Sequence, residues 1–205
     1  NPGVFAGNTY TEADKNVDLF YKKKYLRTGD LGRKDGDEYL WITGRAKDLI
    51  IRGGHNIDPA ILEEALLGHE AVAFAGAIGQ PDQRAGELPC VYVELVDGAN
   101  VTPEELDKFC GETVKEKAAL PKHVEILSEL PKTAVGKVFK PDLRKRAITR
   151  VFTESFSSAN VNATITSVED DKKLGLVANI SSNEEDTIIN EVLGEFTIPW
   201  QRVSK

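Results

Sequence analysis

The stretch TGRAKDLIIRGGHNIDP, residues 43–59, restricts the fold of this chain more than any other. It reads as the end of a strand, a charged joint, a short apolar strand, a pair of glycines and the start of a helix. Gly53 and Gly54 allow positive φ angles or the close approach of a ligand to the backbone. Asp58 followed by Pro59 predicts an N-cap with proline at the first helical position. Taken alone, the stretch predicts a strand–turn–helix unit and no particular function.

The segments around this stretch predict a compact unit of strands and helices. After a short strand at 49–51, the apolar pattern predicts a helix over 59–69, strands over 72–78, 89–96 and 124–127, and a second helix after residue 102. Thr102 and Glu105 have the spacing of a capping box at the start of that second helix. We expect loops at 81–88 and 131–137, and a short basic helix at 141–149.

Both ends of the chain predict smaller units. Asp35-Gly36 predicts a β-hairpin whose strands lie around residues 30–31 and 39–43. Alternating segments at 160–167 and 174–180 predict a second hairpin, followed by a helix that begins at Ser182 or Asn183 and runs to Phe196. The expected fold class is therefore α+β: a small β-rich N-terminal part, a compact lid domain with a central three-stranded sheet and flanking helices, and an appended hairpin–helix.

The composition argues against several classes of function. A net charge of −7 disfavours a general nucleic-acid binder, which usually presents a basic field. No apolar run approaches the roughly 20 residues that span a bilayer, and no signal peptide opens the chain. Cys90 and Cys110 lack the spacing of a zinc site, so we expect no metal site, and reduced, mostly buried thiols in a cytoplasmic protein. The chain has no methionine and begins with Asn1, so we expect a fragment or a processed product.

Four motifs occur in a particular order along the chain: YLRTGDLGRKDGDEYLWITGR, GRAKDLIIRGGHNIDPAILEEAL, GQPDQRAGELPCVYVEL and LPKTAVGKVFKPDLRK. In this order and separation they resemble the C-terminal portion of the adenylate-forming superfamily of acyl-CoA synthetases, adenylation domains and luciferases. Within it they resemble the AMP-forming acyl-CoA synthetases. The resemblance covers residues 1–149. It implies that 1–46 end a large N-terminal domain, that 47–150 form a mobile catalytic lid domain, and that 151–205 are an appended extension of unknown role.

The resemblance also implies roles for three residues near the expected domain boundary. Asp30 corresponds to the carboxylate that binds the ribose hydroxyls of ATP or AMP. A carboxylate suits this role because its two oxygens can accept two hydrogen bonds at once. Arg45 corresponds to an arginine that contacts the nucleotide. Lys47 lies where the family has the hinge between its two domains.

Two further sites are implied within the lid domain. Gly53 and Gly54 match the loop that lines the channel for the pantetheine arm of CoA. The resemblance also implies that Gly54 is one of the catalytic residues. Lys137 matches the lysine needed for adenylation, and Gly136 is expected to let a flexible loop present it. A lysine there would offset the repulsion between the attacking carboxylate and the α-phosphate of ATP, alongside Mg²⁺.

The implied function is an acid–thiol ligase that turns a carboxylic acid, expected to be a fatty acid, into an acyl-adenylate and then a CoA thioester. A rotation about Lys47 would exchange the two half-reactions. The phosphate-binding loop, the acyl and adenine pockets and the magnesium-site carboxylate of the family are absent from this sequence. We therefore expect it to work with a missing N-terminal domain and to be inactive alone.

Other interpretations remain open at this point. The chain could belong to an adenylation domain that loads a carrier protein, or it could be a non-catalytic interaction module. Lys137 taken by itself is a solvated loop lysine, and His55 is more simply a loop residue than an acid or base. The basic side chains between residues 140 and 150 could bind the phosphates of CoA or form a solvated face.

Overall fold

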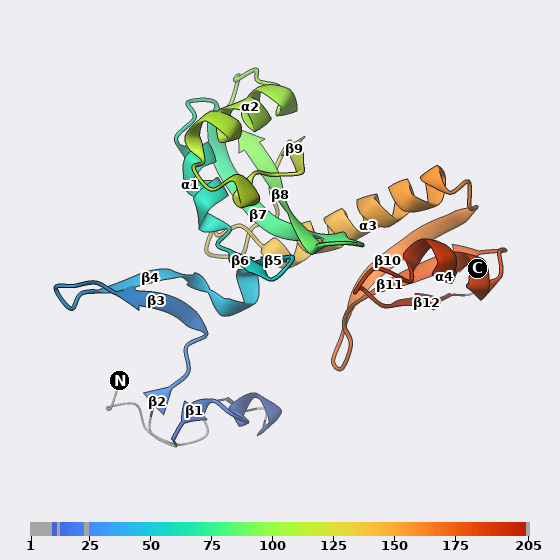
Figure 1. Cartoon of the computed structure of the whole chain (residues 1–205), viewed down its shortest axis with the longest axis horizontal. Coiled ribbons are helices and arrows are strands. Elements are labelled where there is room, and N and C mark those ends of the chain that lie inside the picture. The colour runs from blue at the N-terminus through green and yellow to red at the C-terminus, as the bar shows by residue number, and fades with distance from the viewer. Residues whose placement is uncertain (1–9, 12, 23–24, 204–205) are drawn as a thin grey trace. The chain divides into compact units, whose positions relative to one another are not determined.

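The computed structural model describes residues 10–11, 13–22 and 25–203 (Figure 1). Residues 1–9 of the first expected segment lie outside this description. The chain divides into two compact units, one up to Lys47 and the other from Asp48 onward. The functional division into three domains stays a prediction.

The N-terminal unit is rich in short strands. It contains a 3₁₀ turn at Ala13–Asn16 and the strands β1 (Phe20–Tyr21), β2 (Tyr25–Leu26), β3 (Asp30–Lys34) and β4 (Leu40–Arg45). Strands β3 and β4 are antiparallel, so the predicted hairpin is confirmed. Its turn is fixed by Asp35, whose Oδ1 accepts hydrogen bonds from the backbone N–H groups of Asp37 and Tyr39 at 3.0 and 2.9 Å.

A five-stranded sheet is the centre of the second unit. Its strands are β5 (Ile50–Arg52), β6 (His55–Ile57), β7 (Val72–Asp82), β8 (Gly86–Leu95) and β9 (His123–Leu127). The antiparallel pair β7–β8 and the parallel pair β8–β9 form the expected three-stranded centre. The hairpin β5–β6 enlarges this sheet through a single register pair, Arg52 with Gly86. The α+β class is confirmed.

Helices α1 (Ala60–Leu67) and α2 (Pro103–Thr113) cover one face of this sheet. Leu62 and Leu66 of α1 pack with Leu106 of α2 against β8, and all three are fully buried. The capping box at the start of α2 is confirmed. The N-cap of α1 is Pro59, one residue after the expected Asp58. Asp58 Oδ1 still accepts a hydrogen bond from Ala60 N at 2.9 Å.

The prediction of a loop at residues 81–88 is wrong. Strands β7 and β8 run on to Asp82 and start at Gly86, which leaves only residues 83–85 for the turn. The polar composition of this segment indicated a loop. Its backbone nevertheless continues the ladder, because Asp82 Oδ1 closes a tight turn by accepting from Arg84 N and Ala85 N at 3.0 and 2.7 Å.

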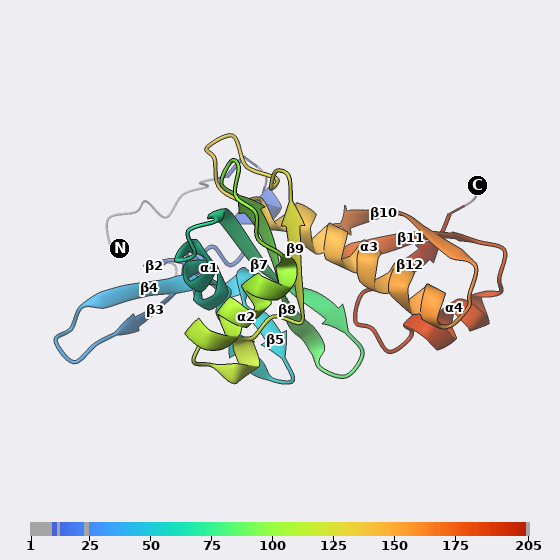
Figure 2. The same ribbon diagram turned by 90° about the horizontal axis from the view of Figure 1, so that it is seen from above.

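The helix expected to end at Thr149 is twice as long. Helix α3 (Lys140–Ser158) continues because its apolar face extends through Val151, Phe152 and Phe156. Its first half covers the second face of the five-stranded sheet, and its second half covers another sheet, as Figures 1 and 2 show. The expected boundary between residues 150 and 151 therefore falls inside a continuous helix.

The C-terminal extension adds a small mixed sheet to α3. It contains β10 (Ala163–Asp171), β11 (Gly175–Ser182), α4 (Asp186–Leu193) and β12 (Trp200–Arg202). The predicted hairpin is present as β10–β11, and β12 pairs with β11 in parallel, which the sequence did not indicate. Helix α4 starts after the expected Ser182 or Asn183, because Ser182 belongs to β11 and Glu185 flanks the helix. No helix in the described part of the chain is long and apolar enough to cross a membrane.

We predict that Phe152→Ala lowers the free energy of unfolding by about 3–5 kcal/mol, because Phe152 is fully buried between α3 and the extension. Urea unfolding followed by circular dichroism measures this. Thr153→Ala is the matched control: its side chain is exposed on the same helix, and we expect a change within about 0.5 kcal/mol. Equal effects of the two substitutions would contradict the shared core.

Candidate functional site

The β3–β4 ladder brings the two predicted nucleotide contacts together. Asp30 and Arg45 are register partners, and Arg45 Nε lies 2.8 Å from Asp30 Oδ1. Thr28 Oγ1 accepts a hydrogen bond from Asp30 N at 3.1 Å, which fixes the start of β3. The Arg45 side chain is 57% exposed and that of Asp30 29% exposed, so both reach solvent. The two residues, predicted as separate nucleotide contacts, form an ion pair with each other.

Lys47, the predicted hinge residue, is the last residue of the N-terminal unit. It lies in a 3₁₀ turn, Ala46–Asp48, and is exposed. The next residue is held in the second unit, because Arg144 donates a hydrogen bond to Asp48 Oδ1 at 3.1 Å. The chain therefore becomes fixed to α3 immediately after Lys47.

Gly53 and Gly54 form the two-residue turn between β5 and β6. Their φ angles are +55° and +88°, and the pair Arg52 with His55 closes the hairpin. Two positive φ angles in a two-residue hairpin are typical of a type I′ turn, which glycine adopts without steric cost. A Cβ atom on either glycine would meet nothing within 4 Å. The positive φ angles, and not steric crowding, therefore explain why both positions are glycine.

The glycine turn borders a hollow of about 550 Å³ with a cationic lining. Gly53 N donates to Ala85 O at 2.8 Å, which attaches the turn to the end of the β7–β8 hairpin. Side chains of Arg52, Arg84 and Lys117 line the hollow. His55 also lines it from strand β6, so the expectation that it is a loop residue is wrong.

Lys137 lies on a small hairpin with defined hydrogen bonds, where the sequence indicated a flexible loop. Gly136 has a φ angle of +77°, and its N–H donates to Thr133 O at 2.8 Å. Thr133 N donates to Lys137 O at 2.7 Å, and Thr133 Oγ1 accepts from Lys137 N at 3.2 Å. This pattern resembles a three-residue hairpin turn closed by a left-handed glycine. Lys137 itself is exposed.

The glycine turn and the lysine hairpin lie at different ends of the β7–β8 ladder. The glycine turn contacts the end where Asp82 pairs with Gly86, and the stem of the lysine hairpin contacts the end where Phe74 pairs with Glu94. At about 3.3 Å per residue, the eight steps from Phe74 to Asp82 place these two ends of the ladder roughly 26 Å apart. Figure 2 shows β5 and the segment between β9 and α3 on different sides of these two strands.

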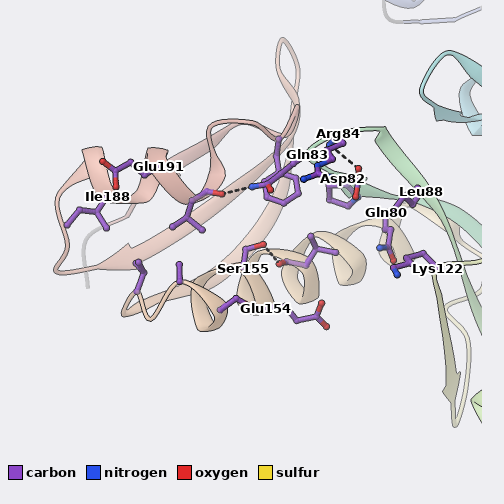
Figure 3. A pocket seen from close by; sticks show the side chains of 17 residues that line it. Gln80, Asp82, Gln83, Arg84, Leu88, Lys122, Glu154, Ser155, Ile188 and Glu191 are labelled. Carbon is purple, nitrogen blue, oxygen red and sulfur yellow. Dashed lines mark hydrogen bonds between the residues drawn. The ribbon is translucent and has the colours of Figure 1, made fainter.

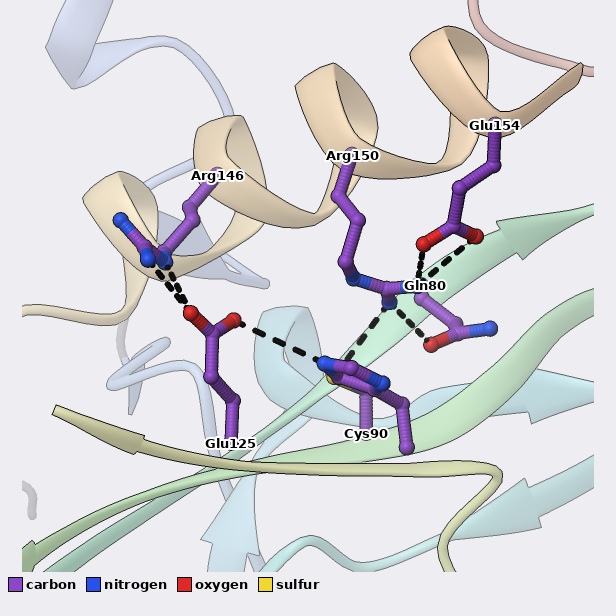
Figure 4. A network of polar contacts seen from close by, with 7 residues as sticks. Gln80, Cys90, Glu125, Arg146, Arg150 and Glu154 are labelled. Atoms are coloured by element: carbon purple, nitrogen blue, oxygen red, sulfur yellow. Dashed lines mark hydrogen bonds and ion pairs between the residues drawn. The ribbon is translucent and has the colours of Figure 1, made fainter. Parts of the chain in front are cut away.

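Four basic side chains between residues 140 and 150 are paired within the fold. Lys140 Nζ lies 2.8 Å from Glu63, Arg144 pairs with Asp48, Arg146 with Glu125, and Arg150 donates to Gln80 at 2.7 Å and to Glu154 at 3.2 Å (Figure 4). These contacts fix α3 to the sheet. Lys140, Arg144 and Arg150 are largely buried, whereas the Arg146 side chain is 50% exposed. Binding of CoA phosphates by these residues stays a prediction.

Both cysteines are free and buried. Burial raises the pKa of Cys90 to about 11, although Arg150, whose guanidinium lies 4.0 Å from the sulfur, opposes the shift (Figure 4). Burial likewise raises the pKa of Cys110 to about 11. At neutral pH both groups are thiols, which are poor nucleophiles.

A hollow of about 900 Å³ lies between the end of the β7–β8 hairpin, α3 and α4 (Figure 3). Gln83 Nε2 donates to Val192 O across it at 3.0 Å. No residue assigned a role from the sequence lines it. Apart from Gln80 and Lys122, its lining comes from the segment expected to be a loop and from the extension, and no motif in the sequence indicated it. Among the described residues no group of three or more acidic, histidine or cysteine side chains could hold a metal ion.

Residues 62–137 match the family model of the AMP-binding enzyme C-terminal domain. Over these residues the chain is similar to that domain. A marinolic acid–CoA ligase from Pseudoalteromonas sp. (strain SANK 73390) is 48% identical over 145 residues, which are 71% of this chain and 22% of the relative.

Solved structures show the same likeness. An o-succinylbenzoate CoA synthetase from Bacillus subtilis, in complex with its acyl-adenylate intermediate, is 36% identical with a TM-score of 0.60, covering 65% of this chain and 27% of that one. An amide bond synthetase from Marinactinospora thermotolerans is 32% identical with a TM-score of 0.57, covering 64% and 26%. The chain spans about a quarter of the length of the relatives it matches. Its resemblance to adenylate-forming enzymes is confirmed.

We predict that Gly54→Ala destabilises the protein by roughly 1–2 kcal/mol, because alanine at a φ of +88° is strained even where space is open. Gly111→Ala is the control, since Gly111 lies in α2 with nothing near its Cβ position. There alanine should stabilise by about 0.5–1 kcal/mol. Urea unfolding of both variants measures the difference, and a stabilising Gly54→Ala would contradict the type I′ assignment.

We predict that Cys90 and Cys110 resist a thiol-specific aromatic disulfide reagent in the native protein at pH 8. Burial denies access, and a pKa of about 11 leaves about one thiol in a thousand ionised. Absorbance should report two reactive thiols only after denaturation. Rapid reaction of either thiol before unfolding would show that the packing is looser than described.

Proposed function

We propose that this chain is part of an AMP-forming acyl-CoA synthetase, an acid–thiol ligase that uses ATP to join a carboxylic acid to CoA. Similar proteins include a marinolic acid–CoA ligase and a 2-succinylbenzoate–CoA ligase, and the chain spans about a quarter of their length. It would therefore act with a large N-terminal domain that supplies the acyl and adenine pockets. We extend the proposal to a fatty acid as the substrate and to the cytoplasm as the location.

In the first half-reaction a carboxylate oxygen of the acid attacks the α-phosphorus of ATP. A carbon-bound oxygen becomes bonded to phosphorus, and pyrophosphate leaves with its bridging oxygen. Asp30, oriented by Arg45, would accept hydrogen bonds from the ribose hydroxyls. The exposed ammonium of Lys137 would offset the charge that develops on the reacting oxygens. Mg²⁺, when bound, would neutralise phosphate charge, and we propose that it is held by the phosphates and the large domain.

In the second half-reaction the sulfur of CoA attacks the carbonyl carbon of the acyl-adenylate. A carbon–sulfur bond forms, the carbon–oxygen bond to AMP breaks, and the thiol proton passes to solvent. The turn at Gly53 and Gly54 would border the path of the pantetheine arm, with Gly54 nearest the reaction. The cationic side chains of Arg52, Arg84 and Lys117 line the adjacent hollow, where an anionic ligand would be favoured.

The observation that carries the proposal is the placement of these two features at opposite ends of one β-ladder. Because these ladder ends lie roughly 26 Å apart, we propose that the two features serve the reacting centre in turn. A rotation about Lys47 would present first one end and then the other. The change from one compact unit to the next directly after Lys47 supports this pivot.

A second candidate differs in the acceptor. The likeness to an amide bond synthetase favours an amine as an alternative to a thiol in the second half-reaction. Loading of a carrier protein is the remaining thiol-based alternative. Supplying a purified acyl-adenylate with CoA, an amine or a carrier discriminates among the three by the product formed.

We predict that Lys137→Ala lowers adenylation by about 10²–10³-fold in a protein that joins this chain to its large domain, because a group stabilising the transition state is lost. ATP–pyrophosphate exchange measures this step, and thioester formation from supplied acyl-adenylate should be retained. Lys108→Ala, which removes a lysine exposed on α2, is the control and should leave both steps unchanged. Equal loss of both steps in Lys137→Ala would contradict the division of labour.

We predict that the 205-residue chain alone shows no ATP–pyrophosphate exchange with any carboxylic acid, because it lacks the proposed acyl and adenine pockets. The assay is run at high protein concentration with a short-chain, a long-chain and an aromatic acid. Turnover above background would refute the need for a large domain.

A further inference from the structure

Lys137 is carried by a hairpin that is closed by its own hydrogen bonds. Its two stems meet in an antiparallel bridge between Lys132 and Val138. Thr133 connects them again near the tip, through both its backbone and its hydroxyl group. Because the hairpin is internally connected, the direction of Lys137 depends on what holds the two stems to the domain.

The carboxylate of Glu94, near the end of β8, holds the first stem. It accepts hydrogen bonds from Leu130 N at 2.7 Å and from Lys132 Nζ at 2.7 and 2.9 Å. The side chains of Glu94 and Lys132 are only 15% and 20% exposed, so water competes little for these charge-assisted bonds. Lys132 Nζ also lies 4.2 Å from the centroid of the Phe74 ring, within cation–π range.

The ionisation of Glu94 suits this role. Burial of the carboxylate favours its neutral form, but the hydrogen bonds from Lys132 and from Leu130 N outweigh burial and hold the pKa of Glu94 below its usual range. Glu94 is therefore charged at neutral pH, where the contact with the Lys132 ammonium is strongest.

The second stem is seated by close packing against β7. A Cβ atom on Gly76 would lie 2.9 Å from Val138 Cγ1 and 2.7 Å from Leu143 Cδ1. The absence of a side chain at Gly76 thus lets Val138 and the start of α3 approach the sheet. The hairpin is held by a charged contact on one stem and an apolar contact on the other.

We propose that Glu94 and Lys132 are positioning residues that set the direction of the Lys137 ammonium by fixing the hairpin beneath it. They act through the hairpin backbone and contact no reacting atom. This inference rests on the proposed role of Lys137 in adenylation. It predicts that loosening the Glu94–Lys132 contact weakens the adenylation step selectively.

The structural part of the proposal is tested on the 205-residue chain by amide hydrogen exchange. In Glu94→Gln the amide still accepts a hydrogen bond but no longer pairs with the ammonium. The N–H groups of Thr133, Gly136 and Lys137 should exchange at least tenfold faster than in the unmodified chain. Glu129→Gln is the control, because it makes the same charge change at an exposed position beside Leu130, and it should leave these rates unchanged.

The functional part is tested in the protein that joins this chain to its large domain. Glu94→Gln and Lys132→Met should each lower kcat for ATP–pyrophosphate exchange by about 10–100-fold, the scale on which a small misplacement acts, with little change in KM for ATP. The double variant should lose no more than either single one, and Lys132→Arg should restore most of the rate. Thioester formation from supplied acyl-adenylate should stay unchanged in all of them.

The outcomes separate this inference from the proposed function. If Glu94→Gln leaves the exchange of the hairpin N–H groups unchanged, the positioning role is overturned whatever the activity. If it speeds that exchange without slowing adenylation, while Lys137→Ala abolishes adenylation, the positioning role fails and the proposed function stands. If Lys137→Ala itself has no effect on adenylation, the proposed function fails.

Discussion

The ladder between β7 and β8 is the constraint on which the second unit depends. Its alternate side chains point to two different cores: Ala77 and Val91 face α1 and α2, whereas Ile78 and Cys90 face α3. A slip by one residue would exchange every one of these side chains between the two faces. The ladder also sets the distance between the glycine turn and the lysine hairpin, because each contacts one of its ends.

Helix α3 connects the central sheet to the extension. Its first half is fixed to the sheet by Leu143 and Ala147 and by ion pairs such as Arg144 with Asp48. Its second half supplies Phe152 and Phe156 to the core of the extension. One uninterrupted helix therefore contributes side chains to both cores.

Much of this arrangement could be predicted from local sequence rules. The Asp-Gly turn, the capping box at Thr102 and the alternation in β8 each express a local preference that the packing also satisfies. The polar end of the β7–β8 hairpin resembles a loop in sequence, but its strands pair through the backbone as far as Asp82 and Gly86, and this pairing does not depend on side-chain polarity.

The site could be predicted only in part. Lys137, Gly53 and Gly54 could be found from motifs, but the pairing of Asp30 with Arg45 depends on register, and Glu94 reaches Lys132 across 38 positions of sequence. The central claim is that the two candidate sites are held at fixed, distant ends of one sheet. Double electron–electron resonance measures the distance between spin labels attached at the exposed positions His55 and Val135. Cys90 and Cys110 are replaced by alanine so that only these two positions carry labels. The account predicts one narrow distribution centred at roughly 26 Å or beyond. A broad distribution, or one centred well below 20 Å, would contradict it.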